Sequence, residues 1–98
     1  MDKKKISNLI DKWEGKKISD MSFLAEMTLC FHTKSEMIDF LQSLFTRQER
    51  KAFATRMLIV KKLKEDMPQH QIAKKLKVGV LTVTRGSLEI EKGRFGFI

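Results

Sequence analysis

The sequence lacks the features of secreted and membrane proteins. It has 98 residues with one cysteine, one proline, one tryptophan and no tyrosine. A single cysteine, Cys30, excludes an internal disulfide, and its apolar neighbours predict a small buried side chain in a reducing compartment. No apolar run reaches the ~18–20 residues of a membrane span, and no hydrophobic stretch follows the charged first residues as in a secretory signal. We therefore expect a cytoplasmic protein without a membrane partner.

Groupings of catalytic or metal-binding residues are also missing. His32 and His70 stand alone and far apart in the chain. There are no paired carboxylates, no glycine-rich phosphate loop and no spacing of ligands typical of a metal site. The sequence therefore predicts a protein that is not an enzyme and that has no metal site and no cofactor.

The positive charge is concentrated in the second half of the chain. Residues 1–46 contain seven basic and seven acidic residues, whereas residues 47–98 contain thirteen basic and five acidic ones, a net charge of +8. Such an asymmetry favours an anionic partner, most often nucleic acid. The alternative is a solvated basic face with no partner.

Apolar residues recur at helical spacing along most of the chain, which predicts an all-α protein. Threonine followed three residues later by glutamate forms two capping boxes, at Thr33 and at Thr46, each opening a helix. We expect further helices over residues 5–14, 20–32, 68–76 and 80–91, with Asp66 as a possible cap and a non-helical end at residues 92–98. Residues 1–20 would form a loosely attached arm, and residues 21–98 a single domain.

Residues 68–88 have the pattern of a helix-turn-helix. A short helix from Pro68 is followed by a tight turn at residues 77–79 and by a second helix. Ala73 is small where the two helices cross, Val78 closes the turn over the core, and Val83 points inward. In a basic half-chain this register favours a DNA reader with double-stranded DNA as its partner.

In this arrangement the second helix reads the DNA. Its first turns would meet base edges, where apolar side chains contact thymine methyl groups and threonine hydroxyls donate or accept hydrogen bonds. The start of the first helix and a following lysine would contact phosphates, while His70 is either a phosphate contact or a solvent-facing residue. Because the second helix has no Asn or Gln, shape or water-mediated readout is expected to contribute. The predicted contacts are Gln69, His70, Lys74, Gly79, Val80, Leu81, Thr82 and Thr84.

The chain also resembles the tryptophan repressor family. The resemblance spans about residues 23–88 and is strongest in "ERKAFATR" (Glu49–Arg56) and "TVTRGS" (Thr82–Ser87). It implies an intertwined homodimer whose first helices wrap around the other subunit. It also implies that L-tryptophan acts as corepressor. The ligand would set the angle of the two DNA-binding helix pairs of the dimer for an operator that controls tryptophan biosynthesis or uptake genes.

The resemblance implies a ligand site as well. Arg56 and Arg85 would sandwich the indole, an arrangement favoured by cation–π attraction of ~0.5–2 kcal/mol. Gly86 would let the ligand approach the backbone. Thr46 would lie near the ligand, although helix capping alone also accounts for it.

Several positions depart from the family pattern. Glu89 stands where the family has a serine, Ser43 or Gln42 falls where an apolar pocket residue is expected, and Lys77 replaces a turn glycine. A left-handed backbone at Lys77 would cost ~1 kcal/mol unless it shifted to Gly79. Two alternatives therefore stay open. One is a ligand-independent regulator of the same fold. The other is a protein-interaction adaptor that uses the arm and the apolar end of the chain.

Overall fold

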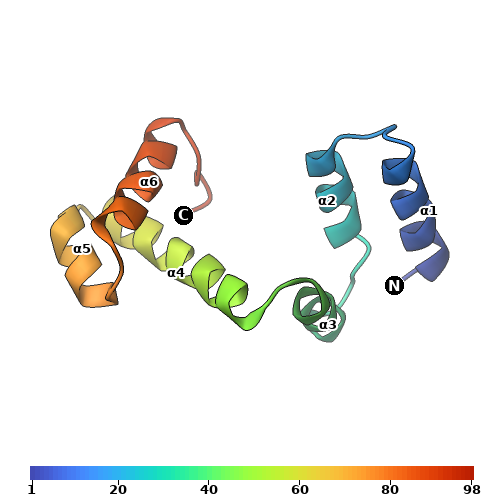
Figure 1. Ribbon diagram of the computed structural model, residues 1–98, viewed down its shortest axis with the longest axis horizontal. Helices are drawn as coiled ribbons and strands as arrows, with labels where there is room; N and C mark the ends of the chain where they lie inside the picture. Colours follow the sequence, from blue (N-terminus) through green and yellow to red (C-terminus); the bar gives the residue numbers. More distant parts are fainter. The chain divides into compact units, whose positions relative to one another are not determined.

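The computed structural model describes residues 1–98 and contains six helices and no strand, so the predicted all-α class is confirmed. The helices are α1 (Lys3–Glu14), α2 (Asp20–Thr28), α3 (Lys34–Leu44), α4 (Arg47–Lys64), α5 (Gln69–Leu76) and α6 (Val80–Glu91). They form two compact units, Met1–Phe45 with α1 to α3 and Thr46–Ile98 with α4 to α6 (Figure 1). None of the helices combines the length and the apolar character needed to cross a membrane.

The first unit is built around a small apolar cluster of Leu9, Met27 and Cys30. Partly buried side chains of Ile6, Phe23, Phe31 and Phe40 pack against it. Cys30 is 2% exposed, which confirms the prediction that it is buried. Through Leu9, α1 is packed onto α2. The boundary between an arm and a domain at residue 20 stays a prediction.

Two helix limits in this unit differ from the expectation. The first helix starts at Lys3 because the Asp2 carboxylate caps it, accepting from the N–H groups of Lys4 and Lys5 at 3.0 and 3.2 Å. The second helix ends at Thr28 rather than at residue 32. There the backbone tightens into a turn that brings the Phe31 ring onto the Phe40 ring, with centroids 4.5 Å apart.

Both predicted capping boxes are present. The Thr33 and Thr46 hydroxyls accept from the backbone N–H groups of Glu36 and Glu49, and each glutamate carboxylate accepts from the N–H of its threonine. These bonds favour the ionised carboxylates. The pKa of Glu36 is lowered, mainly by the bond from the His32 N–H, and the pKa of Glu49 is lowered by the bonds with Thr46.

The second unit has its own core of Ile59, Ile72, Ala73 and Val83, to which Leu63, Met67, Leu76 and Val78 are added at the edge. The four core residues come from all three helices, and α5 and α6 both pack against the C-terminal part of α4 (Figure 1). Ile72 on α5 and Val83 on α6 are fully buried, and the burial of Val83 fixes which face α6 turns outward.

The connections between the helices of this unit bear on two of the predictions. Asp66 is not a helix cap. Its backbone is left-handed (φ 64°), and α5 begins after Pro68 without a side-chain cap. The left-handed residue that ends α5 is Lys77 (φ 56°, ψ 46°), whereas Gly79 has an extended backbone (φ −70°, ψ 147°). The turn therefore keeps its geometry at Lys77 despite the missing glycine.

Candidate nucleic-acid interface

The helix pair α5–α6 has the predicted register. Ala73 is 6% exposed where α5 meets the core, Val83 is fully buried on the inner face of α6, and Val78 packs against the same cluster. The N–H groups of Lys77 and Val78 both donate to the Ala73 carbonyl oxygen, which closes the turn between the helices. The start of α6 is thereby held on a rigid support.

The outer side of the first turns of α6 is exposed. Val80 is 52% and Leu81 74% exposed, and Thr82 and Gly79 also lie at the surface. Exposed aliphatic side chains at the start of this helix suit contact with thymine methyl groups. The N-cap of α6 is Gly79, so no side chain caps the helix, and the Thr82 N–H donates to the Gly79 carbonyl oxygen at 3.1 Å. These features make this end of α6 a surface suited to the floor of a DNA groove.

The predicted phosphate contacts lie on α5. His70 and Lys74 are exposed, and Gln69 is partly buried at the first position of the helix. Gln69 also contacts α6, since the Thr84 hydroxyl lies 2.8 Å from its Oε1 and 3.0 Å from the Val80 carbonyl oxygen. The structure thus brings Gln69 and Thr84 together, although the sequence predicts only that each meets DNA.

The charge of the molecule coincides with this unit. The thirteen basic and five acidic residues of residues 47–98 all belong to the unit Thr46–Ile98, while the other unit is neutral by count. The whole net charge of +8 therefore lies on the unit that contains α6. A positive potential on that unit raises the local concentration of polyanions.

The four residues predicted to bind tryptophan lie in the same unit. Arg56 on α4 and Arg85 on α6 are exposed and belong to two helices that pack against each other. Thr46 caps α4 through its hydroxyl, as the capping interpretation requires.

Gly86 is buried where α6 crosses α4. A Cβ atom there would lie 3.3 Å from Ile59 Cγ2 and 3.4 Å from Leu63 Cδ1. Close helix packing is thus sufficient to explain this glycine. Its predicted contact with a ligand stays a prediction.

Glu89 is engaged by cations from the segment that follows α6. Its carboxylate lies 3.2 Å from Lys92 Nζ and 3.9 Å from Arg94 Nε. The same segment is held to α4 by Lys64, whose ammonium donates to the carbonyl oxygens of Phe95 and Ile98. The contact of Lys64 with the end of the chain depends on a turn that the sequence pattern does not contain.

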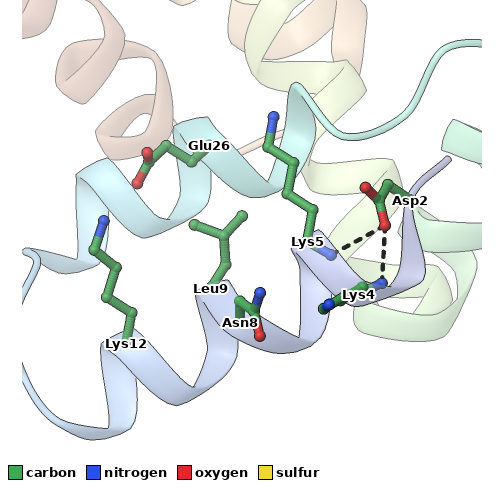
Figure 2. A pocket seen from close by; sticks show the side chains of 7 residues that line it. All are labelled: Asp2, Lys4, Lys5, Asn8, Leu9, Lys12 and Glu26. Carbon is green, nitrogen blue, oxygen red and sulfur yellow. Dashed lines mark hydrogen bonds between the residues drawn. The ribbon is translucent and has the colours of Figure 1, made fainter.

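A separate hollow of about 380 Å³ lies on the first unit (Figure 2). Lys5 and Lys12 extend on either side of Leu9, and Glu26 stands opposite on α2 (Figure 2). None of the residues predicted from the sequence to bind DNA or tryptophan lines it. Nowhere in the structure do three histidine, cysteine or acidic side chains gather closely enough to hold a metal ion.

Comparison with known proteins gives one family. A family model described as "Trp repressor protein" matches residues 19–97. Two curated proteins named "Trp operon repressor homolog", from Vibrio vulnificus strains YJ016 and CMCP6, are each 44% identical over 52 residues, which is 52% of this chain and 51% of theirs. The chain thus matches about half the length of these curated relatives. No solved structure matches it significantly.

Proposed function

Because the chain belongs to the Trp repressor family, we propose that it is a sequence-specific transcription repressor that binds double-stranded DNA through α5 and α6. The observation that carries the proposal is the outward face of α6. Val80, Leu81 and Thr82 are exposed on a helix whose opposite side is anchored by the fully buried Val83, in the unit that holds the whole net charge.

The proposed binding mode follows from that face. The N-terminal turns of α6 enter the major groove, where Val80 and Leu81 meet thymine methyl groups and the Thr82 hydroxyl meets a base edge or a water molecule. Lys74 and the N-terminal end of α5, with Gln69 and His70, meet phosphates on the flanking backbone. With few groups for bidentate base contacts, discrimination relies partly on the shape of the DNA.

A homodimer is the second part of the proposal. Large apolar side chains remain exposed on the helices that the family relation assigns to a shared core. They are Ile38, Leu41, Leu44, Phe45, Phe53 and Leu58, with exposures of 36% to 60%. Exposed apolar surface of this kind marks a protein interface, and a second copy of the chain covers it here. Two α6 helices related by a two-fold axis then read two half-sites of a palindrome.

L-Tryptophan is the proposed corepressor. The packing of α4 against α6 supports this role, since it holds Arg56 and Arg85 on neighbouring helices, each exposed and able to lay its guanidinium over an indole face. Control of tryptophan biosynthesis or uptake genes follows from this ligand.

A second candidate function is regulation without a ligand. The observation that favours it is the pairing of the Glu89 carboxylate with Lys92 and Arg94, which leaves that carboxylate less able to receive a ligand ammonium group. Calorimetry with L-tryptophan separates the two. Binding in the micromolar range supports the corepressor, and the absence of heat supports the ligand-independent regulator.

Fluorescence anisotropy with a palindromic duplex across a salt series tests DNA binding itself. We expect affinity to fall steeply with salt, as basic residues displace counterions from phosphates. Lys74→Glu lowers both the affinity and the salt slope, whereas Lys16→Glu, the same charge change in the neutral unit, changes neither slope nor affinity by more than about twofold. Absence of binding at low salt contradicts the proposal.

A further inference from the structure

We propose that Thr84 is a positioning residue for DNA binding, which acts through Gln69 by turning the Gln69 amide so that its NH₂ group faces a phosphate. The proposal rests on the proposed DNA-binding function and assigns Thr84 a role different from base reading. It is carried by the contact between two side chains from different helices at the start of α5 and the second turn of α6.

The geometry limits what the Thr84 hydroxyl is able to do. Its oxygen lies 2.8 Å from Gln69 Oε1 and 3.0 Å from the Val80 carbonyl oxygen, and Thr84 is only partly exposed. A hydroxyl carries a single proton, so it donates to one of these two oxygens at a time. Leu81 and Thr82, nearer the start of α6, are more exposed than Thr84. Thr84 therefore lies behind the surface that faces the groove, with its hydroxyl directed at protein atoms.

The single proton couples the two side chains. When Thr84 donates to Gln69 Oε1, the Gln69 NH₂ group is left to donate elsewhere. When Thr84 donates to the Val80 carbonyl oxygen, the Gln69 amide turns over and uses its NH₂ group to donate to the Thr84 oxygen. Its Oε1 then takes the outward position.

A phosphate distinguishes these two arrangements. Phosphate oxygens are hydrogen-bond acceptors and not donors. A phosphate at the start of α5 is therefore bound by the Gln69 NH₂ group and repelled by Oε1. DNA therefore selects the arrangement in which Thr84 donates to Gln69. Without the hydroxyl, nothing on α6 holds the Gln69 oxygen inward, and the amide loses its preferred orientation toward the phosphate.

The experiment compares Thr84→Val, which keeps the branched shape without the hydroxyl, with Thr84→Ser, which keeps the hydroxyl. Gln69→Ala and the double variant Gln69→Ala/Thr84→Val complete a double-mutant cycle. Affinity is measured by anisotropy at one salt concentration for two duplexes. One is selected by the wild-type protein from a random-sequence pool, and the other is its scrambled counterpart. Circular dichroism verifies that each variant is helical.

Thr84→Val is expected to lower affinity for both duplexes by a similar factor, roughly 3- to 10-fold per half-site, because a phosphate contact is common to all sequences. Thr84→Ser is expected to retain wild-type affinity within about twofold. Gln69→Ala is expected to reproduce the loss, and the double variant to add nothing further.

Three results overturn the inference while leaving the proposed function intact. The first is a loss of affinity by Thr84→Val for the selected duplex alone, which means that Thr84 reads a base. The others are losses of affinity that multiply in the double variant, and a Thr84→Val variant that binds with wild-type affinity. A wild-type protein that binds neither duplex overturns the proposed function, and this inference with it.

Discussion

Replacing Lys77 by glycine is expected to stabilise the protein, although it removes a side chain from the surface. Lys77 ends α5 with a left-handed backbone, at φ 56° and ψ 46°. It is exposed, and no hydrogen bond or ion pair of its side chain contributes to the turn. The contacts that hold the turn come from its backbone and from Val78, whose N–H donates to the Ala73 carbonyl oxygen at 3.0 Å.

The magnitude follows from two opposing effects. A β-carbon in the left-handed region costs roughly 1–2 kcal/mol, which glycine avoids. Glycine in turn loses more backbone freedom on folding, an effect of about 0.4–1 kcal/mol in the opposite direction. The difference is centred on a gain of about 0.8 kcal/mol, which corresponds to a rise in Tm of roughly 3–6 °C for a domain of this size.

Urea unfolding followed by far-ultraviolet circular dichroism, at one fixed protein concentration, measures this gain. Lys77→Ala is the matched control, because it removes the same charge but keeps the β-carbon. We expect the midpoint to rise for the glycine variant and not for the alanine variant. An equal midpoint for both variants, or a lower one for glycine, refutes the assignment of left-handed strain to residue 77.

Further predictions concern the core, the caps and the ligand site. Ile72→Ala is expected to destabilise the protein by about 2–5 kcal/mol in urea unfolding, whereas Val80→Ala at the exposed face should cost under about 0.5 kcal/mol. Hydrogen bonds lower the pKa of Glu49 in the folded state, so its capping contribution to stability is present at neutral pH and is lost as the pH falls through that lowered value. An acid titration followed by circular dichroism should therefore show a smaller loss of helicity in Glu49→Gln than in the wild-type protein. Arg85→Ala is expected to weaken L-tryptophan binding roughly 2- to 30-fold in calorimetry, with the unfolding midpoint nearly unchanged; an unaltered affinity contradicts the sandwich.

The helices were predictable because their signals are local. Threonine and glutamate at fixed spacing place the starts of α3 and α4 at the observed residues, and Pro68 places the start of α5. Of the two limits that differ, the start of α1 depends on the local cap at Asp2, and the end of α2 depends on a tertiary contact. The end of α2 is set by the stacking of Phe31 on Phe40, a contact between segments that no pattern within α2 records.

The residues exposed at the candidate site were predictable from the sequence, but the contacts between its side chains were not. Alternation of buried and exposed positions along α6 gave Val83 an inner place and Leu81 an outer one, as observed. The pairing of Thr84 with Gln69 joins residues fifteen positions apart, so it depends on the crossing of α5 and α6. The packing of Gly86 against Ile59 likewise becomes visible only when α6 lies on α4.

The central claim is that α6 and the start of α5 form the DNA-binding surface. Its most direct test is the change in backbone amide NMR shifts of the ¹⁵N-labelled protein when a wild-type-selected duplex is added. We predict that the largest changes fall on residues 69–74 and 79–84, with those of α1 nearly unchanged. Changes centred on the lysines of α1, with residues 79–84 unmoved, would contradict the account.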